Sequence, residues 1–268
     1  MIEPGHPAHG RAPEKAGEFT IRQCASLDEM RACFALQKEV WGFSDGELIP
    51  VRLFVVASKI GGQVIGAFDK KDEKLAGFAL AIPAMRNGHS YLHSQMLAVL
   101  PQHRNAGLGR RLKLYQREEA IARGIELMEW TFDPLEIKNA YLNVEKLGAI
   151  ARRYSVNQYG ITSSPLQGGL PTDRLIAEWW MNSRRVQTVL LTNQRPALDA
   201  RMHIDVPAAV SAWKAAPATR WQALEVQDKN RELFLKAFAD GLSILGYERD
   251  TRGNGRFVLG PWDEQLSY

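Results

Sequence analysis

LAVLPQHRNAGLGRRL, residues 97–112, decides the fold of this chain. It begins as an extended apolar segment that Pro101 ends, continues as a basic turn, and opens a helix that we expect to run to about Gly124. The first N–H groups of a helix have no internal partner and carry the positive end of its dipole, so they attract phosphate. Gly107 and Gly109 leave room for a ligand beside the backbone. The stretch therefore predicts a strand, a phosphate-binding turn and a helix.

Positive charge gathers around the same turn, from Arg104, Arg110, Arg111 and Lys113. Two other phosphate-binding loops fit less well. No Lys-Ser or Lys-Thr pair follows the glycines, as a P-loop requires, and the third glycine of a dinucleotide-binding turn is missing. The simpler alternative is an ordinary strand-to-helix turn that uses glycine for geometry and arginine for solubility.

The composition is that of a globular protein. The chain has 268 residues, of which 45% are hydrophobic and 24% charged. No run approaches the ~20 apolar residues of a membrane span. Cys24 and Cys33 give no disulfide framework, and we expect a cytoplasmic protein in which they pack as small apolar groups. The net charge of +4 suits a polyanionic cofactor, but without a long Lys/Arg run it does not indicate nucleic acid.

The apolar pattern predicts an ordered series of elements after a disordered tail over 1–17, which lacks the apolar core of a signal peptide. Ser26 and Glu29 form a capping box that opens a helix ending at Gly42. Asn87-Gly88 indicates a hairpin between two strands. The expected strands are 19–24, 64–68, 75–82, 90–99, 125–131, 153–159 and 173–181, with further helices over 51–60, 108–124 and 135–147.

A second part follows residue 182. Segments 186–191 and 201–206 read as strands, and 221–239 reads as a helix. Segments 243–248 and 255–259 bracket Arg252-Gly253-Asn254 and predict a hairpin. The predicted organisation is therefore a main domain over 18–182 and a small α+β extension over 183–268 packed on it.

The spacing Arg104-x-x-Gly107-x-Gly109 matches the signature (Gln or Arg)-x-x-Gly-x-(Gly or Ala) of GNAT N-acetyltransferases, and the predicted order of elements over 19–182 is the GNAT order. Stretches 130–136, 139–141, 146–148 and 172–175 resemble an uncharacterised bacterial branch of predicted GNAT acetyltransferases. The resemblance implies an α+β fold whose mixed central sheet is flanked by helices. It also implies acetyl-CoA as co-substrate, with no metal.

The resemblance also assigns coenzyme contacts. The strand before the turn diverges from its neighbour in this fold, so the backbone of Leu97 and Val99 is expected to bind the pantetheine arm. The N–H near Leu97 would polarise the thioester carbonyl, an oxyanion-type contribution that reaches ~3–4 kcal/mol. The expected contacts to the remainder of the coenzyme are Arg104, Asn105, Ala106, Gly107, Leu108, Gly109 and Arg110 of the turn, with Asn139 of the later helix.

A general base must deprotonate the acceptor ammonium. Because side chains alternate along a strand, we expect His93, Gln95, Leu97 and Val99 to share one face. Some family members have a glutamate at the position of His93. An imidazole with a pKa near ~6.5 suits a base at neutral pH. The alternative is a half-buried strand histidine bonded to a neighbour.

The general acid departs from the family pattern. Many members carry Asn-x-x-Ala-x-x-x-Tyr-x-x-x-Gly on the helix after the fifth strand. Counting back from Gly148 places Ala140 correctly, but Val144 stands at the tyrosine position and Ile137 at the asparagine position. Tyr141 is then the candidate donor. Otherwise the thiolate leaves unprotonated, which a thiol pKa near ~8.5 tolerates.

Further candidates have packing or solvation as their simpler explanation. Tyr154 and Tyr159 are alternative donors on the next predicted strand. Trp41 begins the loop that walls the acceptor pocket in this fold and could stack on the substrate. Asp45 and Glu47 lie in that loop, and Glu47 is our candidate for binding a cationic acceptor.

The sequence therefore predicts an acyl-CoA-dependent N-acyltransferase, most simply one that transfers acetyl to the amine of a small molecule or amino-acid-like acceptor. The alternative is a catalytically weak acyl-CoA-binding or regulatory protein on the same fold, which the departures at Ile137 and Val144 motivate. A nucleic-acid binder is a third and weaker hypothesis. A homodimer is an option that the sequence leaves open.

Overall fold

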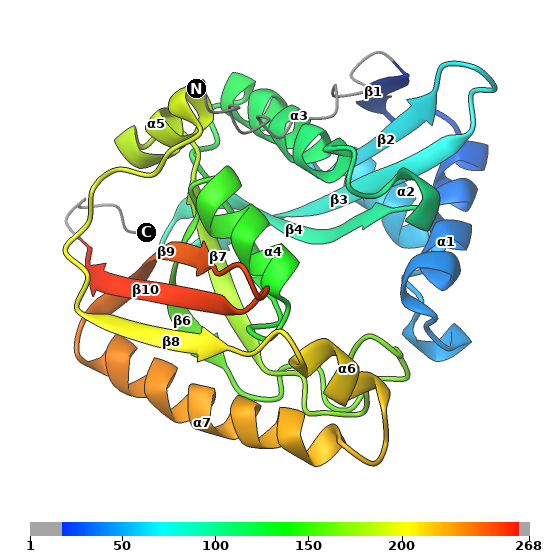
Figure 1. The fold of residues 1–268 in the computed structure, drawn as a ribbon. Coiled ribbons are helices and arrows are strands. Elements are labelled where there is room, and N and C mark those ends of the chain that lie inside the picture. The colour runs from blue at the N-terminus through cyan, green and yellow to red at the C-terminus, as the bar shows by residue number, and fades with distance from the viewer. Residues whose placement is uncertain (1–17, 263–268) are drawn as a thin grey trace, which may run out of the picture.

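The computed structural model describes residues 18–262, so the tail predicted over 1–17 lies outside the described residues. Its strands form one ten-stranded sheet in the order β1-β2-β3-β4-β5-β7-β6-β9-β10-β8 (Figure 1). The strands are β1 (Phe19–Gln23), β2 (Gln63–Asp69), β3 (Leu75–Arg86), β4 (His89–Val99), β5 (Leu127–Phe132), β6 (Ile150–Ser155), β7 (Arg174–Trp180), β8 (Met202–Val206), β9 (Leu242–Arg249) and β10 (Gly255–Pro261).

The helices lie between these strands as the sequence predicts up to residue 182. They are α1 (Leu27–Trp41), α2 (Val51–Lys59), α3 (Leu108–Ala122), α4 (Ile137–Tyr141), α5 (Arg184–Thr192), α6 (Val210–Ala215) and α7 (Arg220–Ala239). The capping box of Ser26 and Glu29 is present, and Gly42 ends α1 with φ +63°. The predicted helix 135–147 begins later, at Ile137, and continues from α4 as a π-helical turn over Leu142–Lys146.

The mixed sheet expected from the sequence is confirmed. β4 and β5 run parallel and are joined by α3, whereas the other strand pairs among the described residues are antiparallel. β7 lies between β5 and β6, so the chain crosses over before it returns to the sheet. A parallel pair needs a crossover connection, and the α3 segment provides it.

The two faces of the sheet have different covers. On one face, α1 and α2 bury Met30, Cys33 and Phe54 against strand residues such as Phe78 and Met96. The other face of β2–β4 is covered by α3 through Leu108 and Leu112. Further along that second face, α4 and α7 pack on β5–β10 in the largest cluster, which includes Ala140 and Phe234. The N-terminal turn of α3 therefore lies on the second face, beside β4.

The segment after residue 182 continues the same sheet. β9 pairs with β6 through Ala151 and Ile244, and Figure 1 shows α7 running along the strands of this half. One prediction here was wrong: residues 186–191 lie in α5 and not in a strand. Ser183 caps that helix by accepting a hydrogen bond from the N–H of Val186 at 3.2 Å.

Buried ion pairs also join the two segments. Lys214 of α6, 3% exposed, places its Nζ 2.8 Å from Asp133 Oδ2 and 3.0 Å from Glu136 Oε1. Arg231 of α7 donates to Asp173 Oδ2 at 2.7 Å. Pairing with carboxylates offsets the cost of burying the Lys214 ammonium, so these contacts fix α6 and α7 to the loops that flank β5 and β7.

Candidate active site

The strands β4 and β5 part just before the glycine turn. Their ladder consists of two pairs, Leu92 with Met128 and His93 with Glu129. β4 continues from there to Val99 and stays paired with β3 on its other side. The backbone groups of residues 94–99 that face β5 are therefore outside the β4–β5 ladder. Such a wedge offers peptide donors and acceptors to an extended ligand.

A β-bulge in β4 changes which side chains share a face. Leu80 pairs with Met96 and the next residue, Ala81, pairs with Ser94, so Gln95 is the extra residue. Leu97 and Val99 then pack on the α3 side, as do Leu92 and Ser94 before the bulge. The expectation that His93, Gln95, Leu97 and Val99 share one face was wrong, because strict alternation breaks at the bulge. His93 lies on the face opposite α3.

The turn into α3 leaves its helix N-terminus open. Gly107 takes the N-cap position with φ +75°, and no described side chain caps the helix. Asn105 is also left-handed, with φ +63°. The first intrahelical bond runs from the Arg111 N–H to the Gly107 carbonyl at 3.0 Å, so the N–H groups of 108–110 precede it. An open helix start of this kind binds anions.

Several basic side chains near this turn hold protein carbonyls. Arg104 donates from Nε to the Val99 oxygen at 3.0 Å, and Arg111 donates to the Phe19 oxygen at 3.1 Å. Arg110 approaches the Lys146 oxygen at 3.4 Å. The peptide N–H groups are thus the donors that the turn itself presents, while these arginines supply positive charge around it.

Opposite α3, His93 lies beside a network of carboxylates and guanidinium groups. Glu129, 3% exposed, accepts two 2.7 Å bonds from Arg86 and one from Arg153. Arg153 also reaches Glu178 at 3.2 Å, and Arg152 donates to Glu178 at 2.5 Å. This ion network consists of Arg86, Glu129, Arg152, Arg153 and Glu178.

Three influences act on the pKa of the His93 imidazole. Burial lowers it, the carboxylate of Glu129 raises it, and the amine of Lys113 lowers it. Burial dominates because it disfavours the charged imidazolium. His93 is therefore neutral over a wider pH range than an exposed histidine, which is the state that accepts a proton.

Lys113 is a residue that sequence reasoning misjudged, because it is not part of the surface charge around the turn. Its side chain is 2% exposed beneath α3, and burial lowers the pKa of its amine well below the usual value. The sheet-facing side of α3 includes Lys113, Gln116 and Ala120. Because two of these residues are polar, the sequence shows no hydrophobic pattern that would mark them as buried. The ion network was also missed, since charged residues inside strands read as solvent-facing.

The helix after β5 offers no tyrosine at the family position. Val144, at that position, is buried in the largest apolar cluster. The ring of Tyr141 lies 5.2 Å from Lys146 Nζ and 5.7 Å from the guanidinium of Arg249, which belongs to β9. Asn139 is exposed. The Tyr141 ring is thus placed beside cations on the side of α4 toward β9.

The predicted acceptor residues lie in a tied pair of loops. Trp41 stacks on Phe43 with ring centroids 5.7 Å apart and contacts Phe78 edge-on. Glu47 accepts from the N–H of Ser163 at 3.0 Å and from its hydroxyl, and these bonds lower the pKa of the Glu47 carboxyl. Glu47 thereby links the loop after α1 to the loop before β7.

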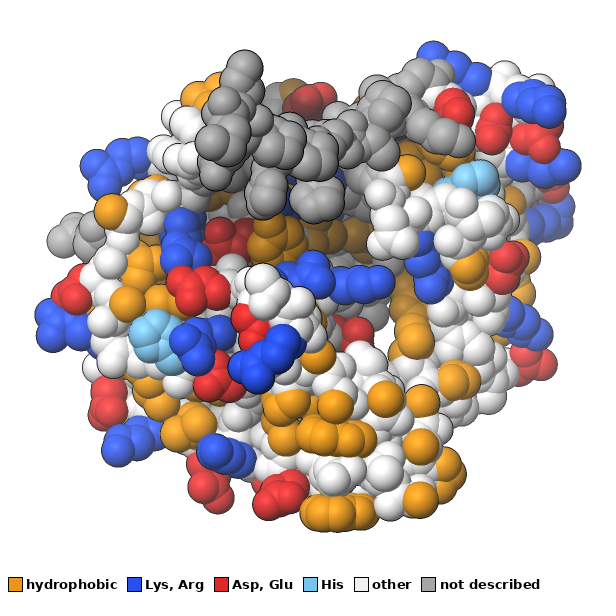
Figure 2. Space-filling model, in the orientation of Figure 1, with side chains coloured by type: hydrophobic (Ala, Val, Ile, Leu, Met, Phe, Trp, Pro, Cys, Tyr) orange, Lys and Arg blue, Asp and Glu red, His pale blue; other side chains and the backbone are white. Residues whose placement is uncertain are grey.

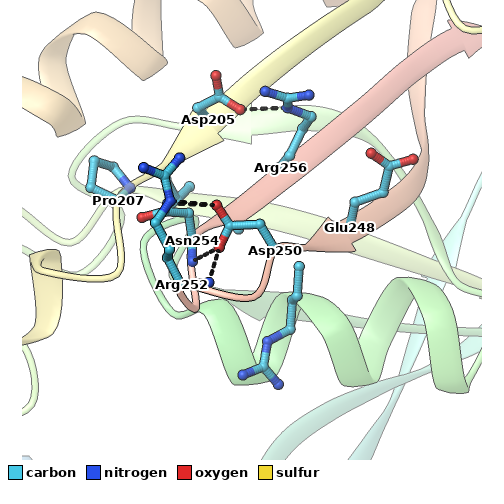
Figure 3. A pocket seen from close by; sticks show the side chains of 10 residues that line it. Asp205, Pro207, Glu248, Asp250, Arg252, Asn254 and Arg256 are labelled. Carbon is cyan, nitrogen blue, oxygen red and sulfur yellow. Dashed lines mark hydrogen bonds and ion pairs between the residues drawn. The ribbon is translucent and has the colours of Figure 1, made fainter.

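Two open hollows of about 410 and 420 Å³ are found elsewhere, and neither is lined by the turn before α3. The first lies between β8, β9 and β10 (Figure 3). Several of its polar side chains bind one another: Arg256 binds Asp205 at 2.6 Å, and Asp250 accepts from Asn254 at 2.7 Å. Figure 2 shows acidic and basic side chains interspersed on this part of the surface. We do not place the active site in either hollow.

Within residues 18–262, no group of three or more His, Cys, Asp or Glu side chains is arranged to hold a metal ion. Over the same residues, the helices are too short or too polar to cross a membrane.

Comparisons with known proteins agree with this geometry. Residues 30–142 match the model of the acetyltransferase (GNAT) family. No match was found among curated proteins. The solved structure of yncA from Salmonella typhimurium, with its cofactor acetyl-CoA, is 16% identical, with a TM-score of 0.50 over 63% of this chain and 96% of that one.

Other solved structures resemble the same part of the chain. The ribosomal-protein-S18-alanine N-acetyltransferase from Escherichia coli is 16% identical and has a TM-score of 0.48, covering 62% of this chain and 95% of its own. A GNAT-family acetyltransferase from Streptococcus pneumoniae is 19% identical and has a TM-score of 0.48, covering 60% and 98%. At 16% identity, the likeness to the Salmonella typhimurium structure concerns the fold alone.

Proposed function

We propose that this chain is an acyl-CoA-dependent N-acyltransferase of the acetyltransferase (GNAT) family, whose model matches residues 30–142. Acetyl-CoA is the proposed donor, and the proposed acceptor is the amine of a small molecule or amino-acid-like compound. The observation that carries the proposal is the parting of β4 from β5 after His93, directly before the open N-terminus of α3.

The proposed coenzyme site uses backbone groups in two places. The β5-facing edge of 94–99 suits the amide-bearing pantetheine arm, with Leu97 and Val99 as its main contacts. The turn over 104–110 suits the pyrophosphate, because the N–H groups of 108–110 precede the first helical bond. Gly109 leaves its backbone accessible, and Asn139 is a further proposed contact from α4. An N–H near Leu97 would polarise the thioester carbonyl.

We assign the acceptor to the face opposite α3, where His93 lies. The neutral imidazole would take the proton of the acceptor ammonium, directly or through water, so that the free amine attacks the carbonyl. The loops joined by Glu47 and Ser163 are the proposed walls of the acceptor pocket, with Trp41 at their start. Residues 183–268 are proposed as an extension of the acetyltransferase part.

The pH dependence tests the role of His93. Because its folded-state pKa is lowered, we expect kcat/KM to stay high down to a pH below the ordinary ~6.5 of histidine and then to fall. The unfolded chain binds the proton more readily, so His93 also lowers folding stability as pH falls below ~6.5. In His93→Gln the acid limb should vanish and the stability loss on acidification should shrink. An unchanged acid limb would contradict the assignment.

Calorimetric titration with acetyl-CoA tests the function. We expect saturable binding of one coenzyme per chain, and a thiol-release assay against a panel of amines should then identify an acceptor. Coenzyme binding without turnover on any amine would favour the alternative of a catalytically weak acyl-CoA-binding protein, which the buried Val144 at the tyrosine position supports. If the protein does not bind acetyl-CoA, both the acyltransferase and the acyl-CoA-binding protein are ruled out.

A further inference from the structure

Lys113 has an unusual position for a cation. Its Nζ donates a 2.7 Å hydrogen bond to Ser94 Oγ, lies 3.7 Å from the ring centroid of Trp130 and stands 3.7 Å from the sulfur of Met128. The β4–β5 ladder ends at His93 and Glu129, so Ser94 of β4 and Trp130 of β5 are the first residues beyond it. The amine therefore lies where the two strands part.

His93 and Lys113 flank this point from opposite faces. Leu92 and Ser94 face α3, so His93 between them faces away. The two groups are still close enough for the amine to influence the pKa of the imidazole. A thioester held in the wedge would have a proton acceptor on one face and a proton donor on the other.

The Lys113 amine contacts a hydroxyl, a thioether and an aromatic face, and none of these three groups is charged. Burial disfavours the ammonium, whereas the face of Trp130 stabilises it. The titratable group that this amine influences is His93 on β4, whose own pKa is also raised by the carboxylate of Glu129. Such an ammonium releases its proton more readily than that of an exposed lysine.

We propose that Lys113 protonates the thiolate that leaves in the acyl transfer. The proposal rests on the proposed function. The amine of the acceptor forms the new carbon–nitrogen bond, and its proton goes to His93 or to water. The carbon–sulfur bond breaks, its electron pair goes to sulfur, and the sulfur takes a proton from Nζ, directly or through the hydroxyl of Ser94. Lys113 is left as a neutral amine and regains a proton from solvent after product release.

Two further observations favour this donor. The helix that supplies a tyrosine in the family has Val144 there, buried among apolar side chains, and the ring of Tyr141 lies beside Arg249 of β9. Lys113 is five residues into α3, about 7.5 Å along the axis from the proposed pyrophosphate site. The negative charge of coenzyme phosphates at that distance would stabilise the protonated form of the Lys113 amine before the reaction.

The test compares Lys113→Met with Lys229→Met, which removes an exposed lysine of α7. We expect Lys113→Met to keep its acetyl-CoA affinity within about threefold while kcat with the identified amine falls about 100-fold, the usual size of a general-acid effect. Lys229→Met should match the wild type. A Lys113→Met enzyme that keeps both affinity and kcat overturns the proposal. The proposal is also overturned if Tyr141→Phe loses turnover while Lys113→Met keeps it.

A second measurement needs no acceptor. In protein labelled with ¹³C at lysine Cε, the Lys113 resonance is the one that is missing from the spectrum of Lys113→Met, or of Lys113→Gln if that variant folds better. The pH dependence of this resonance reports the ionisation of the Lys113 amine. We expect it to titrate below the other lysines and its midpoint to rise when coenzyme A is added. A midpoint that ignores bound coenzyme A overturns the proposal. Calorimetry tests the proposed function separately: if the wild-type protein binds no acetyl-CoA, the proposed function is wrong, whatever the titration of Lys113 shows.

Discussion

We expect Gly109→Glu to weaken coenzyme binding strongly while the fold survives. A carboxylate in the first turn of α3 would occupy the place proposed for the pyrophosphate. Two like charges about 4 Å apart repel by about 4 kcal/mol at an effective dielectric constant of about 20. Solvent and salt reduce this, so we expect an affinity loss of at least about 100-fold. Titration calorimetry with acetyl-CoA measures it.

The fold should tolerate the substitution for two reasons. A Cβ at Gly109 would lie 3.8 Å from Leu97 Cδ2 and 3.9 Å from Val99 Cγ2, which is ordinary contact. An acidic residue near a helix N-terminus stabilises it by about 0.3–1 kcal/mol. Gly109→Ala is the matched control and should bind within a few-fold of wild type. Equal binding by all three proteins would show that the coenzyme does not use this turn.

Glu129→Gln should cost the largest amount of stability among single changes near the site. The glutamine keeps the size of the side chain but leaves Arg86 and Arg153 without their shared carboxylate. Breaking a buried pair costs about 3–5 kcal/mol. The two arginines are 31% and 39% exposed and recover some hydration, so we expect about 2–4 kcal/mol, or roughly 4–12 °C in Tm.

The control for this prediction is Asp28→Asn, which breaks an exposed pair with Arg31. Exposed pairs contribute about 0–1 kcal/mol, so its Tm should stay within a few degrees of wild type. Thermal and urea unfolding of both variants at pH 7 make the comparison. If Glu129→Gln is as stable as Asp28→Asn, the ion network does not stabilise the sheet in the way its geometry indicates.

Local signals were enough to predict most of the main fold. The capping box at Ser26 and Glu29, the Asn87-Gly88 turn and the glycines of the 104–109 turn each have a short-range physical cause. Each therefore appears in the sequence as a residue type at a fixed spacing. The same turn was the basis for predicting the coenzyme site, and its open helix start is present in the structure.

Features that depend on distant partners could not be predicted in this way. The bulge at Gln95 has no glycine or proline to mark it, because it arises from the pairing of β4 with β3. Lys113 is buried because α3 packs on the sheet with this side chain against Ser94 and Trp130. Residues 186–191 have the β-branched composition of a strand, but Ser183 caps them as a helix and Val186 and Val189 pack inward. The pairing of β9 with β6 has no local signal.

The strand order also has a consequence for synthesis on the ribosome. β6 emerges well before its outer neighbour, because Ala151 pairs with Ile244 about 90 residues later. At about 5–20 residues per second, that edge waits roughly 5–18 s for β9 to arrive. An unpaired strand edge is a template for association with other chains. The nascent chain therefore presents an unpaired β6 edge, open to association with other chains, until β9 has left the ribosome.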